Sequence, residues 1–365
     1  MNAARSAWRS GWVQALVAVV AFVVAATLLW WRGPEWGSVL EAFRIVIWSW
    51  IILAFLLNVV STLFRALSWR LTISQALPRA DQPRLVHVLS SFGVGLLANA
   101  IVPGRLGELA RVATLRRHLP QAPHGTSATL VGTVFAHRLF DLVPATILVV
   151  WVLFTAEVPH WAVVSFVIAA LVGFALFTIA WLGARRHKRP VMSEGVGSVR
   201  HLLGMARQGL TVLKAPLPLA GAVLLQCLGW LMQLLAVYAA MQAFDIDAPL
   251  PAAGLVLVLM NIATIVPLWP GNVGLVQAAV ALPLLNYGVP YATGFAYGIV
   301  LQAIEMACGV GLGLIALGRE GISIAMLRRM QAEEDSSEDV LEGVSEMVEE
   351  LEHEAVARES ASVSR

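Results

Sequence analysis

The sequence predicts an all-α integral membrane protein, a helical bundle that crosses the membrane several times. Hydrophobic residues make up 58% of the 365 residues and charged residues only 13%, and the mean hydropathy is +0.76. Soluble domains contain about 25% charged residues, so this composition excludes an ordinary soluble protein. Trp12 to Trp31 is an uncharged run of 20 residues, long enough as a helix to cross a hydrocarbon core of about 30 Å.

Apolar segments later in the chain predict about six full spans in total. The second span is expected near 45–64, because a run of arginines typical of a cytoplasmic loop follows it. These arginines are Arg65, Arg70, Arg79 and Arg84. The other full spans are expected in the ranges 126–155, 159–183 and 218–244, with a last span that ends at Gly318.

The segment from Asn99 to Arg111, NAIVPGRLGELAR, interrupts an apolar run with Pro-Gly and then adds three charges. Proline lacks the N–H donor and clashes with the preceding turn, so a helix must break here. Broken backbone at membrane depth is tolerated only where it is buried in protein or lines a wet cavity. We therefore expect a re-entrant hairpin, with arms at 85–102 and 106–118, that forms the floor of a polar cavity.

A second break lies in a stretch without any charged residue, which runs from Ala248 to Ile304. As one continuous helix these residues would be roughly 85 Å long, near three hydrocarbon thicknesses, so the chain must fold back. The break is visible in residues 265–277, IVPLWPGNVGLVQ, with two prolines and a glycine. This pattern predicts a second re-entrant hairpin.

The two breaks resemble each other, since IVP at 101–103 matches IVP at 265–267, and GRLG at 104–107 matches GNVG at 271–274 if three residues are inserted between. The expected topology makes the two hairpins enter from opposite sides of the membrane. Similar elements in opposite orientation are typical of inverted-repeat transporters. The match is only seven positions long, so both an inverted repeat and a chance likeness stay open.

The charge pattern predicts how the chain is divided. A transmembrane domain is expected over 1–330, with halves at 10–184 and 215–320 that a basic amphipathic helix at 190–214 joins. Residues 331–365 hold 12 acidic residues against 2 basic ones and form an acidic cytoplasmic tail. A solvated helix or disordered tail is one interpretation, and a docking helix for an envelope enzyme or for self-association is the other.

Few residues in the membrane part could carry chemistry. Arg138 and Asp141 are three residues apart, so they share a helix face and can pair. An ionisable residue inside a span is by default a functional hypothesis, although a structural ion pair is the alternative. For Glu108 the alternative is a surface pair with Arg111, and for His137 we expect a structural hydrogen bond. No catalytic, metal or cofactor-binding motif is present.

Four motifs in combination resemble one known family. They are Arg65 with Trp69 and Arg70, NAIVPGRLGELAR from Asn99, HRLFD from His137, and VPLWPGNVG from Val266. Over nearly all of residues 10–320 the chain resembles the lysylphosphatidylglycerol synthase transmembrane-region family, as a stand-alone member without the synthase domain. The resemblance implies a flippase-like bundle with re-entrant helices that moves or binds a phospholipid or lipid-linked headgroup.

The chain departs from the commoner pattern of this family at three positions. His137 and Gln277 stand where many members have Glu, and Gln302 stands where Arg is frequent. The second hairpin has therefore lost charge, which puts in doubt any mechanism that needs an ionisable group on both sides.

The leading hypothesis is a flippase-like protein of the bacterial inner membrane, with both termini cytoplasmic, that binds a lipid headgroup between the hairpins. Arginines would contact phosphate, Glu108 would orient them or contact an amine, and Arg138 with Asp141 would exchange partners between states. The candidate binding residues are Arg105, Glu108, Arg111, Arg138, Asp141, Asn272, Gln277 and Glu305. Membrane lipid is the expected partner, with no nucleic acid, no cofactor and no metal.

Two alternatives belong to other classes. One is a membrane-embedded enzyme that acts on a lipid-linked sugar or phosphate with Asp141 or Glu108, and the other is a non-transporting scaffold for an envelope enzyme. Lipid movement without a chemical product would favour transport, whereas a modified lipid would favour the enzyme.

The topology can be tested with reporter fusions. Because basic loops mark the cytoplasmic side, we predict that both termini and Lys188 report a cytoplasmic location, while Pro34 and Asp245 report an external one. A reporter at Lys188 that faces outside would contradict the topology. Cysteine accessibility at Gly104 and Gly271 distinguishes hairpins from paired full spans, since full spans would expose Gly104 outside and Gly271 inside.

Overall fold

The computed structural model describes residues 35–101, 107–119, 126–164, 215–264 and 272–320, together with Thr27. The expected first span at 12–31, most of the expected span at 159–183, the linker at 190–214 and the tail lie outside these residues. Up to Ala316 the described helices belong to one compact unit, and beyond it only the end of one helix is described.

Four long apolar helices dominate the described part of the chain, and each is long and apolar enough to cross a membrane. They are α4 (Trp48–Ala76), α7 (Thr126–Thr155), α10 (Pro216–Ala243) and α13 (Tyr291–Glu320). Shorter apolar helices lie between them, and no strand occurs in the described ranges. The prediction of an all-α membrane bundle is confirmed.

The expected end of the second span was wrong. Helix α4 continues to Ala76, well beyond Phe64, so Arg65 and Arg70 lie within the helix and not in a cytoplasmic loop. The expectation ended the span at its first charge. Within the bundle, however, Arg65 has polar and aromatic partners on α10, which allow the helix to continue past the charge.

Each break expected from the sequence separates a pair of short helices. These are α5 (Leu85–Ile101) with α6 (Gly107–Arg117), and α11 (Leu250–Ala263) with α12 (Leu275–Leu284). At 1.5 Å per residue, the 14 residues of α11 span roughly 21 Å, less than a hydrocarbon core of about 30 Å. The short arms fit re-entrant hairpins; the turns themselves, at 102–106 and 265–271, are outside the described residues.

Close backbone contact holds the first hairpin together. A Cβ on Gly95 would lie 2.7 Å from the carbonyl oxygen of Gly107, and a Cβ on Gly107 would clash with Gly95 and Asn99. The Asn99 side-chain oxygen accepts a hydrogen bond from the Gly107 N–H at 2.9 Å. Asn99 therefore satisfies one of the free N–H groups at the start of α6 and fixes that helix against α5.

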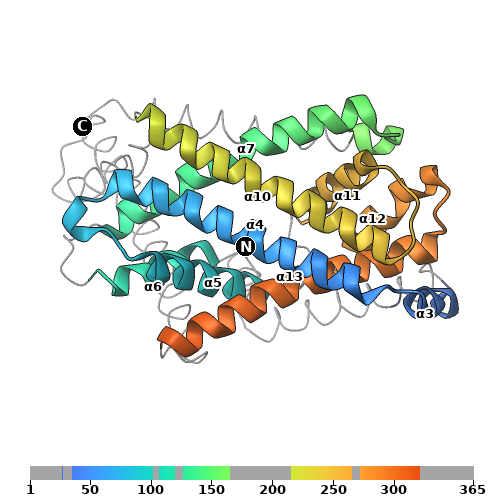
Figure 1. The fold of residues 1–365 in the computed structure, drawn as a ribbon, viewed down its shortest axis with the longest axis horizontal. Helices are drawn as coiled ribbons and strands as arrows, with labels where there is room; N and C mark the ends of the chain where they lie inside the picture. The colour runs from blue at the N-terminus through green and yellow to red at the C-terminus, as the bar shows by residue number, and fades with distance from the viewer. Residues whose placement is uncertain are drawn as a thin grey trace, which may run out of the picture. The chain divides into compact units, whose positions relative to one another are not determined.

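Helices α4 and α10 pack side by side and run antiparallel (Figure 1). The Ser61 hydroxyl donates to the carbonyl oxygen of Gly229 at 2.7 Å, and the Ser68 hydroxyl donates to that of Ala222 at 2.8 Å. Later residues of α4 thus contact earlier residues of α10, as expected for antiparallel helices. The hairpin α5–α6 lies toward one end of this pair and α11–α12 toward the other (Figure 1).

The two halves share one helix order and pack on each other reciprocally. Each half has a long helix, two short helices and another long helix. Gly93 of α5 allows close approach to Leu312 of α13, and Gly254 of α11 allows close approach to Trp151 of α7. The first arm of each hairpin therefore packs on the last helix of the other half. This reciprocal packing and the antiparallel arrangement of α4 and α10 are what an inverted repeat would produce.

The largest cluster of buried apolar side chains surrounds α11, and α3 (Trp36–Arg44) packs near it. Trp36 meets Phe295 edge-on with ring centroids 6.0 Å apart, and Phe43 meets Phe244 at 6.1 Å. The spanning helices also expose large apolar side chains, such as Trp48 at 71%. Such surfaces on long helices fit contact with lipid.

The packing of α5 on α13 can be tested with two glycines of the same helix. A Cβ at Gly313 would clash with Leu97 and lie 2.9 Å from the carbonyl oxygen of Gly93, whereas a Cβ at Gly311 has nothing within 4 Å. We predict that Gly313→Ala destabilises the protein by about 1–3 kcal/mol, while Gly311→Ala is neutral or slightly stabilising. Thermal unfolding in detergent measures both, and equal effects would contradict this packing.

Candidate functional site

Arg138 stands at the centre of an ionic cluster near the middle of α7. Its guanidinium bonds the Glu108 carboxylate of α6, and Nη1 donates to Asp141 Oδ2 at 3.2 Å. The predicted pairing of Arg138 with Asp141 is confirmed. The contact with Glu108 joins two sequence motifs that lie 30 residues apart, and it ties the first hairpin to a spanning helix.

The other oxygen of Asp141 is held by α10. Trp230 Nε1 donates to Asp141 Oδ1 at 3.0 Å, and the buried Gln226 side chain donates to the same oxygen. Hydrogen bonds to the charged form of a carboxylate stabilise that charge. Asp141 is therefore fixed by two helices, with one oxygen toward Arg138 and one toward α10.

Arg111 is buried beside this cluster without an ion pair in the described part of the chain. Its side chain is only 4% exposed, and its guanidinium carbon lies 4.8 Å from the ring centre of Trp69 and 5.5 Å from that of Phe92. Such cation–π contacts stabilise a desolvated guanidinium. Nε and Nη2 donate to no described residue. Buried N–H groups normally have partners, so these two unpaired donors make Arg111 a candidate binding residue.

The open alternative of a surface pair between Glu108 and Arg111 is not what the structure shows, since Glu108 bonds Arg138 and Arg111 is buried. Arg105 lies outside the described residues, so its place in the site stays a prediction.

Arg65 is a functional candidate that the sequence analysis missed. Its guanidinium bonds the Gln233 side-chain oxygen, and its carbon lies 5.3 Å from the ring centre of Trp230. A Cβ at Gly229 would lie 3.1 Å from Arg65 Cγ, so the glycine leaves room for this side chain. Arg65 and Asp141 therefore both contact Trp230: Arg65 lies over its ring, and Asp141 accepts its N–H bond.

Arg65 is also linked to Glu305 of α13. Gln233 accepts from Arg65 and donates through Nε2 to Glu305 Oε1 at 3.1 Å. Glu305 thus belongs to a second polar group, formed by Arg65, Gln233 and Glu305, that α10 connects to the Arg138 cluster. The two groups together hold two arginines and three carboxylates, and the buried Arg111 lies beside the first group.

His137 supports the site through the backbone. Its Nε2 lies 3.0 Å from the carbonyl oxygen of Arg65; since a carbonyl only accepts, Nε2 carries the proton. The ring also meets Phe92 edge-on at 6.2 Å. This contact agrees with the structural hydrogen bond expected for His137.

The two polar candidates of the second hairpin bond their own surroundings. Asn272, in a left-handed conformation with φ of 46°, donates to the carbonyl oxygen of Ala263 at 2.9 Å. Gln277 accepts from the Gly274 N–H at 2.6 Å and donates to the Gln302 side chain. The described contacts do not join either residue to the Arg138 cluster, so their role in binding stays a prediction.

A polar stripe on α10 was the missed signal. Gln226, Trp230 and Gln233 recur at helical spacing within an otherwise apolar span, and all three bond the ionic groups. Neutral side chains do not stand out in a search for charges. Their spacing on one helix face could have identified them.

The fold and the site define a multi-pass membrane protein with a polar cluster at the centre of its spanning helices. Residues 16–313 match the family described as the lysylphosphatidylglycerol synthase TM region. The chain therefore belongs to this family, as the sequence motifs indicated.

Curated relatives support this assignment. A UPF0104 membrane protein of Methanothermobacter thermautotrophicus is 22% identical over 314 residues, which cover 81% of this chain and 90% of the relative. A UPF0104 membrane protein of Pyrococcus horikoshii is 25% identical over 134 residues, which cover 36% of this chain and 38% of that relative. No solved structure matches the chain.

The hydrogen bond from Trp230 to Asp141 can be tested by Trp230→Phe, which removes the N–H but keeps an aromatic ring beside Arg65. A hydrogen bond to a charged group contributes about 1.5–3 kcal/mol, so we predict a clearly lower midpoint of thermal unfolding in detergent. Trp48→Phe is the control, because Trp48 is exposed on α4. Equal midpoints for the two variants would contradict the assigned role of Trp230.

Proposed function

We propose that this protein binds the charged headgroup of a phospholipid, or a lipid-linked headgroup, at the Arg138 cluster and carries it across the membrane. One observation carries the proposal: the Arg138 side chain is 47% exposed although it lies near the middle of a spanning helix. A charge at this depth faces a wet cavity or a polar ligand, because contact with hydrocarbon is costly. Its two carboxylate partners remain partly accessible as well.

The distribution of charge suits a headgroup with both signs. Arg138 and the unused donors of Arg111 fit phosphate, for which a guanidinium offers paired N–H groups. Glu108 and Asp141 fit an amine. A headgroup that enters the cluster would exchange with the existing ion pairs, so binding would loosen the link between α6 and α7. Arg105, six residues before Arg111, would add a further contact to phosphate.

The family name supports a lipid ligand, because it describes the transmembrane region of a synthase of lysylphosphatidylglycerol. The names of the two relatives describe membrane proteins and no ligand. We place the protein in the bacterial inner membrane with both termini cytoplasmic, as the basic loops indicate. For the enzymatic alternative, both carboxylates that it needs already accept ion-pair bonds in the cluster.

The proposal predicts that Arg138→Lys impairs lipid movement although it keeps the charge. Lysine cannot bond two carboxylates with a planar fork, and the loss of one charged hydrogen bond corresponds to about a tenfold lower rate. Glu108→Gln should also lower the rate, because it removes the negative partner. Arg105→Gln should be more damaging than Arg105→Lys. The measurement is movement of labelled lipids across liposomes, for a panel of headgroups, with analysis of the lipid products.

Arg79→Lys is the control, because Arg79 is exposed in the short 3-10 helix η1 (Arg79–Asp81) between α4 and α5. Thermal stability in detergent shows whether each variant is folded. Equal rates for the wild type and every cluster variant would refute the proposal, and a chemically modified lipid would favour the enzyme. If the rate falls only in those variants that also lose thermal stability, the cluster has a structural role and no role in binding.

A further inference from the structure

The two halves of the molecule carry a carboxylate at equivalent positions. Pro103 and Pro267 of the matching breaks are 164 residues apart, and the GRLG and GNVG matches directly after them are 167 apart. The helices that follow, α7 and α13, begin 165 residues apart, and Asp141 and Glu305 are again 164 apart. Both acids lie near the middle of the last long helix of their half. The inverted repeat therefore places Glu305 where Asp141 stands in the first half.

The partners of these two acids differ. Arg138, three residues before Asp141, bonds both that acid and Glu108 of the first hairpin. By the same offset its equivalent is Gln302, which bonds Gln277 of the second hairpin. A neutral pair thus replaces the ion pair between hairpin and helix. Glu305 consequently lacks the arginine that neutralises its counterpart.

Glu305 is bonded by a single described residue. Gln233 Nε2 donates to Oε1 at 3.1 Å, and Oε2 accepts no hydrogen bond from the described part of the chain. Arg65 of α4 bonds the other end of the Gln233 side chain and attracts the Glu305 carboxylate electrostatically without contacting it. The other titratable group nearby is Cys308 on the same helix, which contacts Thr62 of α4. The charge of Glu305 is therefore compensated only from a distance.

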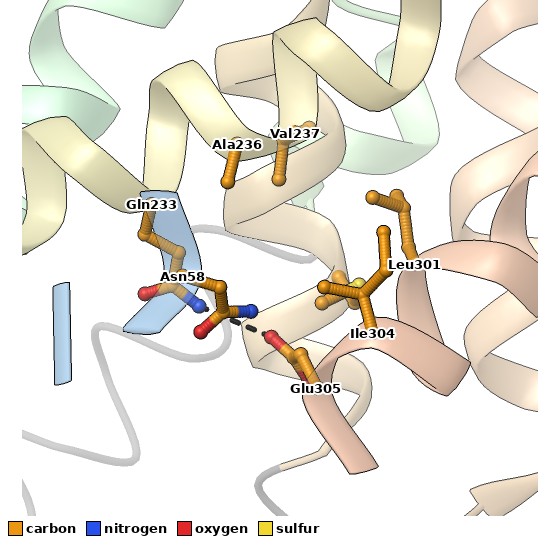
Figure 2. Close-up of a pocket in the computed structure, with 8 residues that line it drawn as sticks. Asn58, Gln233, Ala236, Val237, Leu301, Ile304 and Glu305 are labelled. Carbon is orange, nitrogen blue, oxygen red and sulfur yellow. Dashed lines mark hydrogen bonds between the residues drawn. The ribbon is translucent and has the colours of Figure 1, made fainter. Parts of the chain in front are cut away.

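The carboxylate lines a small cavity between α4, α10, α11 and α13 (Figure 2). Its volume is about 10 Å³, which is about the space needed by one water molecule. The side-chain amide of Asn58 also lines it and makes no hydrogen bond to a described residue. Gln233 lines it too, and the other lining residues are apolar: Ala236, Val237, Met260, Leu301 and Ile304.

The size and the lining of this cavity select its occupant. A lipid headgroup is too large, and hard metal cations of the Mg²⁺ and Ca²⁺ type need six or more oxygen ligands. Among the described residues that line it, only Glu305 and Asn58 offer side-chain oxygens that are not already bonded. One water molecule fits the volume and has polar partners.

We propose that Glu305 is a proton-binding site, at which a water molecule in the cavity exchanges a proton with Oε2. The carboxylate and one proton become a carboxylic acid, and the combined charge of Arg65 and Glu305 changes from zero to +1. Arg65 also stacks on Trp230, which bonds Asp141. Proton uptake at Glu305 would therefore change the electrostatic interaction of Arg65 with the Arg138 cluster. This coupling rests on the proposed lipid function.

Infrared spectroscopy of the full chain in liposomes tests the proton site without any transport. The carboxyl C=O stretch appears only when a carboxylate is protonated, so the wild-type spectrum minus that of Glu305→Gln should contain a pH-dependent carboxylic-acid band. Glu305→Asp should retain such a band, and Asp141→Asn should leave the band of Glu305 in place. A difference spectrum without this band at every pH at which both proteins are folded would overturn the proposal.

The double variant Gln277→Glu with Gln302→Arg tests whether Glu305 binds a proton because it lacks an arginine three residues before it. It would create an ion pair between α12 and α13, as Glu108 and Arg138 form one between α6 and α7, and it places an arginine three residues before Glu305. We expect the pH-dependent band of Glu305 to disappear while the thermal stability stays near that of the wild type. A band that persists in this folded variant would contradict the missing arginine as the reason for proton binding.

Coupling is measured separately as the rate of lipid movement under an imposed pH gradient. We expect the rate to respond to the gradient in the wild type and to lose this response in Glu305→Gln. A band without lipid movement would refute the transport function but keep the proton site. Lipid movement that responds to the gradient in both proteins would overturn coupling through Glu305.

Discussion

The ionic contact of Arg138 with Glu108 and Asp141 is the interaction on which the rest of the structure depends. Charges at membrane depth are costly unless they are paired or wet, and this contact pairs a spanning helix with a re-entrant hairpin. The same cluster reaches α10 through Gln226 and Trp230. One arginine thus connects the three elements that would have to separate if a headgroup entered.

The two halves have the same helix order but different polar contacts between their short and long helices. Antiparallel α4 and α10 and the reciprocal packing of Gly93 and Gly254 give each half the same framework. The first half places an ion pair between hairpin and helix, and the second half places two glutamines there. We infer a division of labour in which the first half binds the headgroup and the second half binds a proton at Glu305.

Local patterns in the sequence predicted what depends on local geometry. Hydropathy identified the four long helices, Pro-Gly breaks located the boundary between the short helices of each pair, and the three-residue spacing predicted the pairing of Arg138 with Asp141. Contacts between distant segments were not predictable in this way. The bond from Arg138 to Glu108 depends on tertiary packing. The role of Arg65 depends on its partners on α10, which a charge at the expected end of a span does not indicate.

Native mass spectrometry of the purified protein tests the central claim most directly, because it detects lipid that stays bound to the folded chain. The exchange variant Glu108→Arg with Arg138→Glu keeps an ion pair between the hairpin and α7 but reverses the positions of its charges. We predict that the wild type retains a lipid with a charged headgroup and that the folded exchange variant loses it. Equal retention by both proteins would contradict headgroup binding at this cluster.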